Sequence, residues 1–213
     1  MSNIAVQKIL LMVVAVGALS IGIYFAQQAQ SQPPIAARVF EPVRLIKAFE
    51  LTNQHQQKID NNYFNDHWTL IFLGYTHCPD VCPTTLAQLV GSEKRLKTAG
   101  TDNVQVMFVS IDPKRDSPAR LKEYTEYFNK DFTAVTGPHV NLYPFVRDLG
   151  LLYSMSEDTS LPEYSVNHSG GIVLVNPQGQ LHAMFRPTTP LGGIPGIDMA
   201  ELEADFTQLT KRF

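Results

Sequence analysis

An uncharged apolar segment near the start of the chain predicts a membrane-spanning helix. Residues 9–26, ILLMVVAVGALSIGIYFA, are 18 consecutive positions without a charge, which lies in the lower part of the range of about 17–25 residues that cross a bilayer. Lys8 precedes this run, and the next cation is Arg38. Because cations that flank a span favour the cytoplasmic side, we expect an N-terminal anchor within residues 1–26 and the rest of the chain outside the cytoplasm.

A cleaved signal peptide is the competing interpretation, because it also pairs a basic start with an apolar run. Two features favour an uncleaved anchor. The run exceeds the usual length of about 7–15 residues, and no A-x-A pattern follows it at the required place. Residues 27–40 are polar and contain prolines, which predicts a linker. In a bacterium the C-terminal domain would then lie on the periplasmic side of the inner membrane, an oxidising space.

Two nearly continuous apolar runs predict buried strands. Residues 68–75 (WTLIFLGY) and 104–111 (VQVMFVSI) have the pattern of strands that are covered on both faces. Between them, residues 86–96 place apolar side chains at helical spacing. After the second run, Ser117 and Pro118 predict the N-cap and first position of another helix.

The pattern changes again in the last third of the chain. Residues 143–152 predict a further helix. Residues 172–175 and 181–185 flank NPQGQ, a turn signal between two antiparallel strands. Asp198 and Glu201 then have the spacing of a capping box at the start of a closing amphipathic helix.

This order of elements predicts an α/β domain over residues 41–213. The early strand–helix–strand connections imply parallel strands, whereas the late hairpin implies antiparallel ones. A mixed central sheet with flanking helices, a late β-hairpin and a thiol motif at the C-terminal end of a strand describes a thioredoxin-like fold behind one N-terminal transmembrane helix. The position of the motif also follows the rule that ligands meet open α/β sheets beyond the carboxyl ends of the strands.

Composition narrows the classes of function. Of the 213 residues, 44% are hydrophobic and 17% are charged, which is typical of a packed globular protein. The formal net charge of -3 provides no cationic surface, so we expect no nucleic-acid partner.

The two cysteines of the sequence, Cys78 and Cys82, lie four positions apart, and each precedes a proline. Pro83 suits a first helical position, so we expect a turn with Cys82 capping the helix that follows. The helix dipole would then lower the thiol pKa and favour the thiolate. The three intervening residues give a looser loop than a thioredoxin motif. This spacing suits two sulfurs that converge on one metal ion, and a disulfide between them also fits.

A third metal ligand is expected among the six histidines. His168 is the favoured candidate because it precedes a predicted strand and adjoins two glycines, which allow a backbone to approach closely. His77 is disfavoured because adjacent side chains in a turn diverge. The remaining histidines are expected to be solvated: His55, His67, His139 and His182. Two soft thiolates with an imidazole favour copper, whereas a zinc site usually needs a fourth ligand.

Three segments resemble the signature segments of the Sco/SenC family: GYTHCPDVCPTTL (residues 74–86), SIDPKRDSP (residues 110–118) and YSVNHS (residues 164–169). The resemblance extends over about residues 40–190. Members of this family are membrane-anchored copper chaperones for cytochrome c oxidase. One departure is visible, because the aspartate that often precedes the family's histidine is replaced here by Asn167. An acid at that position would orient the imidazole or add negative charge near the metal.

The resemblance implies a set of site residues. It identifies Cys78, Cys82 and His168 as the ligands of copper, either Cu(I) or Cu(II). It also implies that Asp112, beyond the second predicted strand, supports the ligands or faces a partner. Asp80, between the cysteines, is expected to stabilise the turn or to play a similar supporting or partner-facing role.

The resemblance also implies a function. A chaperone of this kind delivers copper to, or helps to mature, the binuclear site of cytochrome c oxidase. Its partners are the copper-bearing oxidase subunit and other copper carriers, and it is not an enzyme in the ordinary sense. The alternative is a thiol–disulfide oxidoreductase that keeps the oxidase cysteines reduced through a redox-active pair, Cys78 and Cys82. A third hypothesis, a peroxidase of the thioredoxin superfamily, requires a threonine and an arginine around one activated cysteine. Thr76 is near, but no arginine adjoins the motif.

Overall fold

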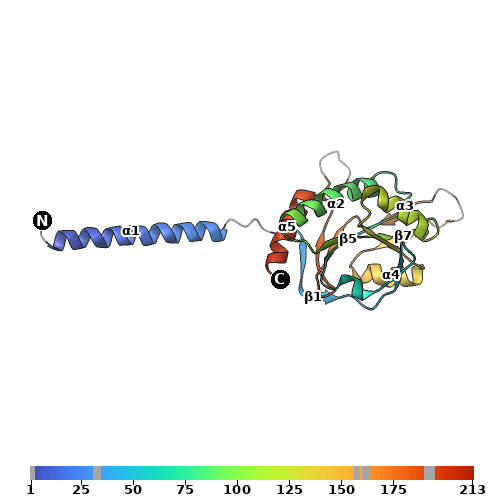
Figure 1. Cartoon of the computed structure of the whole chain (residues 1–213), viewed down its shortest axis with the longest axis horizontal. Coiled ribbons are helices and arrows are strands. Elements are labelled where there is room, and N and C mark those ends of the chain that lie inside the picture. Colours follow the sequence, from blue (N-terminus) through green and yellow to red (C-terminus); the bar gives the residue numbers. More distant parts are fainter. Residues whose placement is uncertain (1–2, 31–34, 156–158, 160–163, 190–194) are drawn as a thin grey trace. The chain divides into compact units, whose positions relative to one another are not determined.

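The computed structural model describes residues 3–30, 35–155, 159, 164–189 and 195–213. The chain divides into two compact units, Met1–Ile35 and Ala36–Phe213. The first unit contains helix α1 (Asn3–Gln30), drawn in blue in Figure 1. Its segment Gln7–Phe25 is long and apolar enough to cross a membrane.

The boundaries of this first unit differ from the predicted ones. Helix α1 continues through residues 27–30, which were predicted as the start of the linker. Residues 31–34 of the predicted linker lie outside the described residues. Its last residues belong to strand β1 (Arg38–Leu45).

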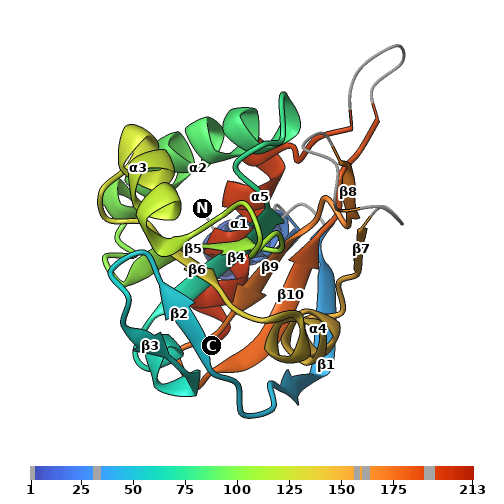
Figure 2. The ribbon, with the colours of Figure 1, turned by 90° about the vertical axis from the view of Figure 1, so that its right-hand side faces the viewer.

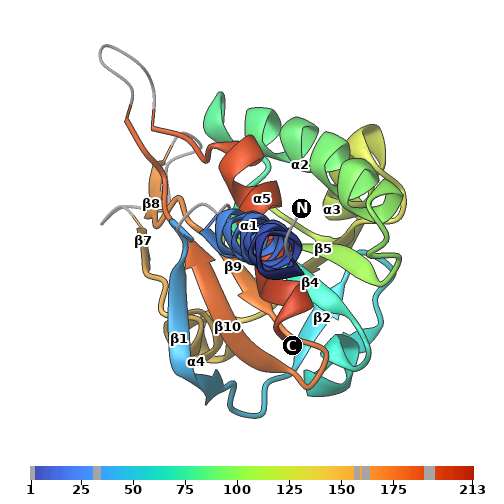
Figure 3. The same cartoon turned by 90° about the vertical axis from the view of Figure 1, so that its left-hand side faces the viewer.

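The second unit is built around one mixed sheet. Among the described residues the sheet has eight strands in the order β1-β10-β9-β4-β5-β6-β2-β3. The pairs β4–β5 and β5–β6 are parallel, and the other neighbouring pairs are antiparallel. The strands after β1 are β2 (Leu51–Asn53), β3 (Lys58–Ile59), β4 (Trp68–Gly74), β5 (Val104–Ser110), β6 (Thr133–Thr136), β9 (Ile172–Val175) and β10 (Gln180–Phe185). Figure 3 shows β1, β10 and β9 side by side.

Strand β4 lies in the middle of this sheet because both of its faces are apolar. All seven of its residues are buried. Ile71 packs in one cluster with Phe145, which lies on helix α4 (His139–Asp148). Phe72 points the other way, where its ring contacts Phe108 and the Phe108 ring contacts Tyr124. Burial of each large apolar side chain contributes roughly 1.5–3 kcal/mol, so the sequence pattern of β4 requires cover on both faces.

Helices supply this cover. Helices α2 (Val81–Thr98), α3 (Pro118–Phe128) and α5 (Met199–Lys211) lie on one side of the sheet, and α4 lies on the other (Figure 2). The elements outside these layers are a short 3-10 helix, η1 (Asn61–Phe64), and a separate two-stranded sheet formed by β7 (Tyr153–Met155) and β8 (Val166–His168).

The predicted fold class is confirmed: a mixed central sheet with flanking helices and a late hairpin, β9–β10. Two predicted helix starts are also confirmed. The Ser117 side chain accepts a hydrogen bond from the Arg120 backbone N–H, and the Asp198 side chain accepts from the backbone N–H groups of Ala200 and Glu201. The helix predicted over residues 143–152 was placed too late, because α4 begins at His139 and residues 153–155 form β7.

Candidate functional site

The loops that follow β4 and β5 meet at one edge of the sheet. Gly74 and Ser110 are paired at the carboxyl ends of these parallel strands, and the Ile111 N–H donates to the Gly74 carbonyl over 3.0 Å. The cysteine loop that follows Gly74 therefore lies beside the loop over residues 111–117. This is the edge at which open α/β sheets hold their ligands.

The two thiols occupy different environments in the cysteine loop. Cys78 is partly exposed and Cys82 is buried, and both are free thiols. The Cys82 sulfur packs so closely on Gly74 that a Cβ at this glycine would come within 2.8 Å of it and within 2.7 Å of the Phe108 ring. Glycine at position 74 is therefore required for the buried position of Cys82.

The structure corrects the predicted place of Cys82 in the helix. Helix α2 begins at Val81 and has Asp80 as its N-cap, so Cys82 lies within the first turn instead of capping it. The exposed Asp80 side chain makes no capping hydrogen bond. The backbone N–H groups of Asp80 and Cys82 are instead directed at the Cys78 sulfur.

These contacts make Cys78 the thiolate of the pair. A hydrogen bond from the Cys82 thiol lowers the pKa of Cys78 most, and burial opposes this effect. The backbone N–H groups of Cys82 and Asp80 and the nearby His168 lower it further, to about 6. The pKa of Cys82 is raised, because its thiol donates to Cys78 and is itself buried. The helix start therefore favours the thiolate of Cys78 and not, as predicted, that of Cys82.

His168 reaches the cysteine loop from the end of β8. Its ring lies edge-on to that of Tyr75, with centroids 6.2 Å apart and an interplanar angle of 89°. Its Nδ1 lies 3.0 Å from the Ser169 carbonyl oxygen, which can only accept a hydrogen bond. Nδ1 therefore carries the proton, and in the neutral ring Nε2 keeps a lone pair for a metal ion.

One cavity of about 310 Å³ brings Cys78 and His168 together. Its wall also contains Tyr75 and Asn167. Within the described part of the chain, no three His, Cys, Asp or Glu side chains already stand close enough to hold a metal ion. The cavity is thus lined by a thiolate and an imidazole, and the buried Cys82 lies next to Cys78, to which its N–H is directed.

Asp112 turns inward from the predicted site. It is buried and accepts hydrogen bonds from the Tyr164 hydroxyl on one oxygen and from Arg115 Nε on the other. Burial and the bond to Asp112 raise the pKa of Tyr164 to about 12. Because the Asp112 carboxylate is enclosed, its position favours the supporting one of its two predicted roles over the partner-facing one.

Asp116 is a site residue that the sequence analysis missed. Its buried carboxylate accepts hydrogen bonds from the Thr76 N–H over 2.9 Å, the Thr76 hydroxyl over 2.7 Å and the Ser110 hydroxyl over 2.6 Å. It thereby ties the start of the cysteine loop to the end of β5. The signal was present in SIDPKRDSP, where it is the second of two aspartates after a buried strand.

The peroxidase hypothesis was disfavoured because no arginine adjoins the cysteine motif in the sequence, and the tertiary structure changes this premise. Helix α3 places Arg120 Nε 3.4 Å from the Thr76 hydroxyl, so an arginine does lie beside the motif. Its Nη1 pairs with Glu123 over 3.0 Å. The Arg120 guanidinium therefore interacts with both Thr76 and Glu123.

Two histidines that were expected to be solvated pack against aromatic rings instead. His139 Nδ1 lies 2.8 Å from the Tyr153 hydroxyl. His182 lies against Trp68, and burial lowers its pKa. Neither histidine lines the cavity that contains Cys78.

Comparisons with known proteins show the family to which the sequence is similar. The profile of the SCO1/SenC family matches residues 39–194. A protein of Stutzerimonas stutzeri, whose name provisionally assigns it copper binding, is 34% identical over 151 residues, which cover 71% of this chain and 74% of that protein.

Two solved structures share the fold. Bradyrhizobium japonicum ScoI with copper bound matches with a TM-score of 0.64 and 26% identity, over 79% of this chain and 99% of that chain. BsSco, described as a member of the Sco family of cytochrome c oxidase assembly proteins and as carrying a disulfide switch, matches with a TM-score of 0.59 and 18% identity, over 79% of this chain and 95% of that chain. From the profile match and these relatives, the chain belongs to the SCO1/SenC family.

Proposed function

We propose that this protein binds one copper ion through Cys78, Cys82 and His168 and delivers it to the copper-bearing subunit of cytochrome c oxidase. The cavity shared by Cys78 and His168 is the observation that carries the proposal. The copper-bound ScoI relative supports the choice of metal. The description of BsSco as a cytochrome c oxidase assembly protein supports the choice of partner.

The chemistry of the ligand set favours copper over zinc. Two thiolates and one imidazole suit Cu(I) in a three-coordinate site, whereas zinc would require a fourth ligand. Both buried acids beside the site already accept hydrogen bonds on each oxygen, Asp112 from Tyr164 and Arg115 and Asp116 from Thr76 and Ser110. The three proposed ligands therefore form a site that holds copper and stays open to a fourth, incoming ligand.

Release would proceed by ligand exchange. A thiolate of the target subunit binds the three-coordinate copper ion while one of the protein's own thiolates leaves and takes up a proton. Partly exposed Cys78 is the accessible sulfur, whereas Cys82 is buried. No bond of a substrate is broken in this exchange, so the activity is that of a chaperone.

Helix α1 would hold the domain at the membrane. Lys8 lies in the first turn of the span Gln7–Phe25, and the next cation, Arg38, lies beyond the end of the span. This arrangement supports a single pass through the inner membrane, with the second unit on the periplasmic side.

Thiol–disulfide exchange is the second candidate function, and the asymmetry of the two thiols favours it. The Cys78 thiolate would attack a disulfide of the target, releasing one target thiolate and forming a mixed disulfide. Cys82 would then lose its proton and attack the Cys78 sulfur, which releases the second target thiolate and leaves a Cys78–Cys82 disulfide. A dithiol reductant would be needed to restore the pair.

Copper stoichiometry tests the leading proposal. The full chain in detergent is titrated with Cu(I) in competition with a chelator, and copper and protein are measured after gel filtration. We expect one copper per chain, and none in Cys78→Ala or Cys82→Ala, because each substitution leaves only one soft ligand. Tight stoichiometric copper in either variant would contradict the ligand set.

A further inference from the structure

Arg115 lies between two tyrosines at the edge of the site. Its guanidinium carbon is 3.6 Å from the centre of the Tyr164 ring and 5.6 Å from that of the Tyr75 ring. Its side chain is 14% exposed, and its Nε donates to the buried carboxylate of Asp112. Cation–π contacts are strongest when the cation is removed from water, so this enclosed position makes both ring contacts effective.

The two tyrosines belong to the two segments that carry the proposed ligands. The Tyr75 carbonyl accepts the Cys78 N–H over 3.2 Å, and the Tyr75 ring meets His168 edge-on. Tyr164 lies two residues before β8, the strand that ends at His168. Arg115 itself lies on a third segment, the loop after β5. It therefore connects the cysteine loop to the segment that precedes β8.

Asp112 fixes the geometry of this contact. One of its oxygens holds Arg115 Nε and the other holds the Tyr164 hydroxyl. The carboxylate thus sets the guanidinium and the tyrosine ring face to face. A lysine could keep the charge but could not stack as a planar group on the ring.

We infer that Arg115 is a positioning residue that holds the His168 strand against the cysteine loop and thereby sets the copper affinity of the site. The inference rests on the proposed ligand set of Cys78, Cys82 and His168. Arg115 acts through Tyr75 and Tyr164 and does not touch the metal.

A double-mutant cycle on the full chain in detergent tests this role. Cu(I) affinity is measured by chelator competition for the parent chain, Arg115→Met, His168→Ala and the double variant. We expect Arg115→Met to weaken binding about tenfold, as expected for loss of an enclosed cation–π contact. In the His168→Ala background the same change should cost nothing further, because no imidazole remains to be positioned. The reduction potential of the Cys78–Cys82 disulfide should be unchanged by Arg115→Met.

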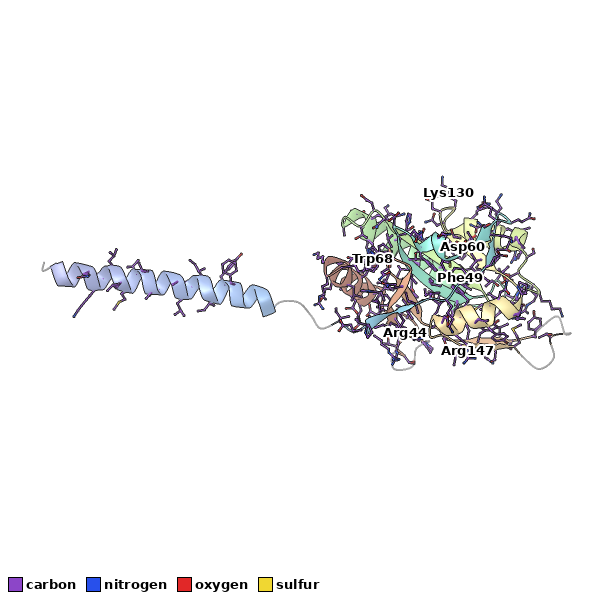
Figure 4. All side chains as sticks on the ribbon, turned by 90° about the horizontal axis from the view of Figure 1, so that it is seen from below. Arg44, Phe49, Asp60, Trp68, Lys130 and Arg147 are labelled. Carbon is purple, nitrogen blue, oxygen red and sulfur yellow. The ribbon has the colours of Figure 1, made fainter. Side chains whose placement is uncertain are left out.

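Arg44→Met is the matched control. Arg44 also stacks on an aromatic ring, Phe40, at 5.5 Å, but it lies on β1 (Figure 4). We expect it to leave copper affinity unchanged. If Arg115→Met does not fold, as judged by circular dichroism, Arg115→Lys replaces it and should weaken binding in the same direction.

The outcomes separate the two proposals. If Arg115→Met lowers the Cu(I) affinity equally with and without His168, general destabilisation explains the effect and the positioning role is wrong. If Arg115→Lys keeps the full Cu(I) affinity, the charge alone explains the effect and the positioning role is also wrong. If His168→Ala leaves the Cu(I) affinity of the parent chain unchanged, the proposed ligand set is wrong, and the role of Arg115 is wrong with it. If Arg115→Met lowers the Cu(I) affinity only when His168 is present, the result supports both the ligand set and the positioning role.

Discussion

The backbone N–H of Cys82 lies 3.4 Å from the sulfur of Cys78. The first turn of α2 therefore stabilises negative charge on the more exposed of the two sulfurs, while the buried sulfur keeps its proton. This asymmetry serves both proposed functions, because the thiolate is the form that binds copper and the form that attacks a disulfide.

Alkylation of the metal-free reduced chain should follow the pKa of Cys78, about 6. Below that pH the sulfur is a thiol and reacts slowly, whereas above it the thiolate predominates. We expect the rate with iodoacetamide, measured from pH 4.5 to 9, to rise with a midpoint near pH 6. Cys78→Ser should react little at pH 7, because the remaining thiol is buried, and burial both restricts access and raises its pKa. A midpoint near the ordinary value of 9.0 would show that these hydrogen bonds do not stabilise the thiolate.

His168→Ala should separate copper delivery from thiol exchange. Loss of the imidazole should lower copper affinity sharply and shift or remove the sulfur-to-copper charge-transfer bands. The Cys78–Cys82 pair should still form a reducible disulfide, because exchange depends on the thiols and their access. In cells, the variant should fail to support oxidase assembly at limiting copper.

His55→Ala provides the control for this substitution. His55 is exposed and does not line the cavity, so its removal should leave affinity, spectrum and assembly unchanged. Full oxidase assembly with His168→Ala would instead make the reductase the leading function.

Asp116→Ala should destabilise the domain by about 2–4 kcal/mol, because it leaves the buried Thr76 and Ser110 donors without an acceptor. Asp116→Asn keeps part of the acceptor capacity and should therefore destabilise the domain less than Asp116→Ala does. Denaturant unfolding can be followed by the fluorescence of Trp68, the single tryptophan of the chain, which is buried and labelled in Figure 4. The same change at exposed Asp131 should alter stability by less than about 0.5 kcal/mol. Equal effects at the two positions would argue against a structural role for Asp116 in the cysteine loop.

The N-terminal helix should remain in the mature protein. The chain should fractionate with membranes, resist extraction at high salt and begin upstream of Gln7 when its N-terminus is sequenced. A protease added to the periplasmic side should release a fragment that retains Cys78 and His168. A mature N-terminus near Ala29 would instead show that the segment is a cleaved signal peptide and that the mature protein lacks this anchor.

The elements that sequence pattern predicts well are those whose signal is local. The apolar runs of β4 and β5, the caps at Ser117 and Asp198 and the NPQGQ turn each depend on residues within a few positions. The start of α4 was placed too late because His139 and Val140 carry no apolar repeat that distinguishes them from a loop. The short strands β6 and β8 have three or four residues each, and their pairing depends on distant partners.

The candidate ligands could be predicted from the sequence because their motifs are local and specific. The candidate membrane span could be predicted because a bilayer requires a long uncharged run. Three properties of the site were decided by the tertiary structure. It directs the helix N–H groups at Cys78, encloses Asp112 and Asp116, and stacks Arg115 between Tyr75 and Tyr164. Each depends on the direction of a side chain between segments that are far apart in sequence. Spacing along the chain does not encode that direction, because the packing of the loops after β4 and β5 and of the segment before β8 sets it.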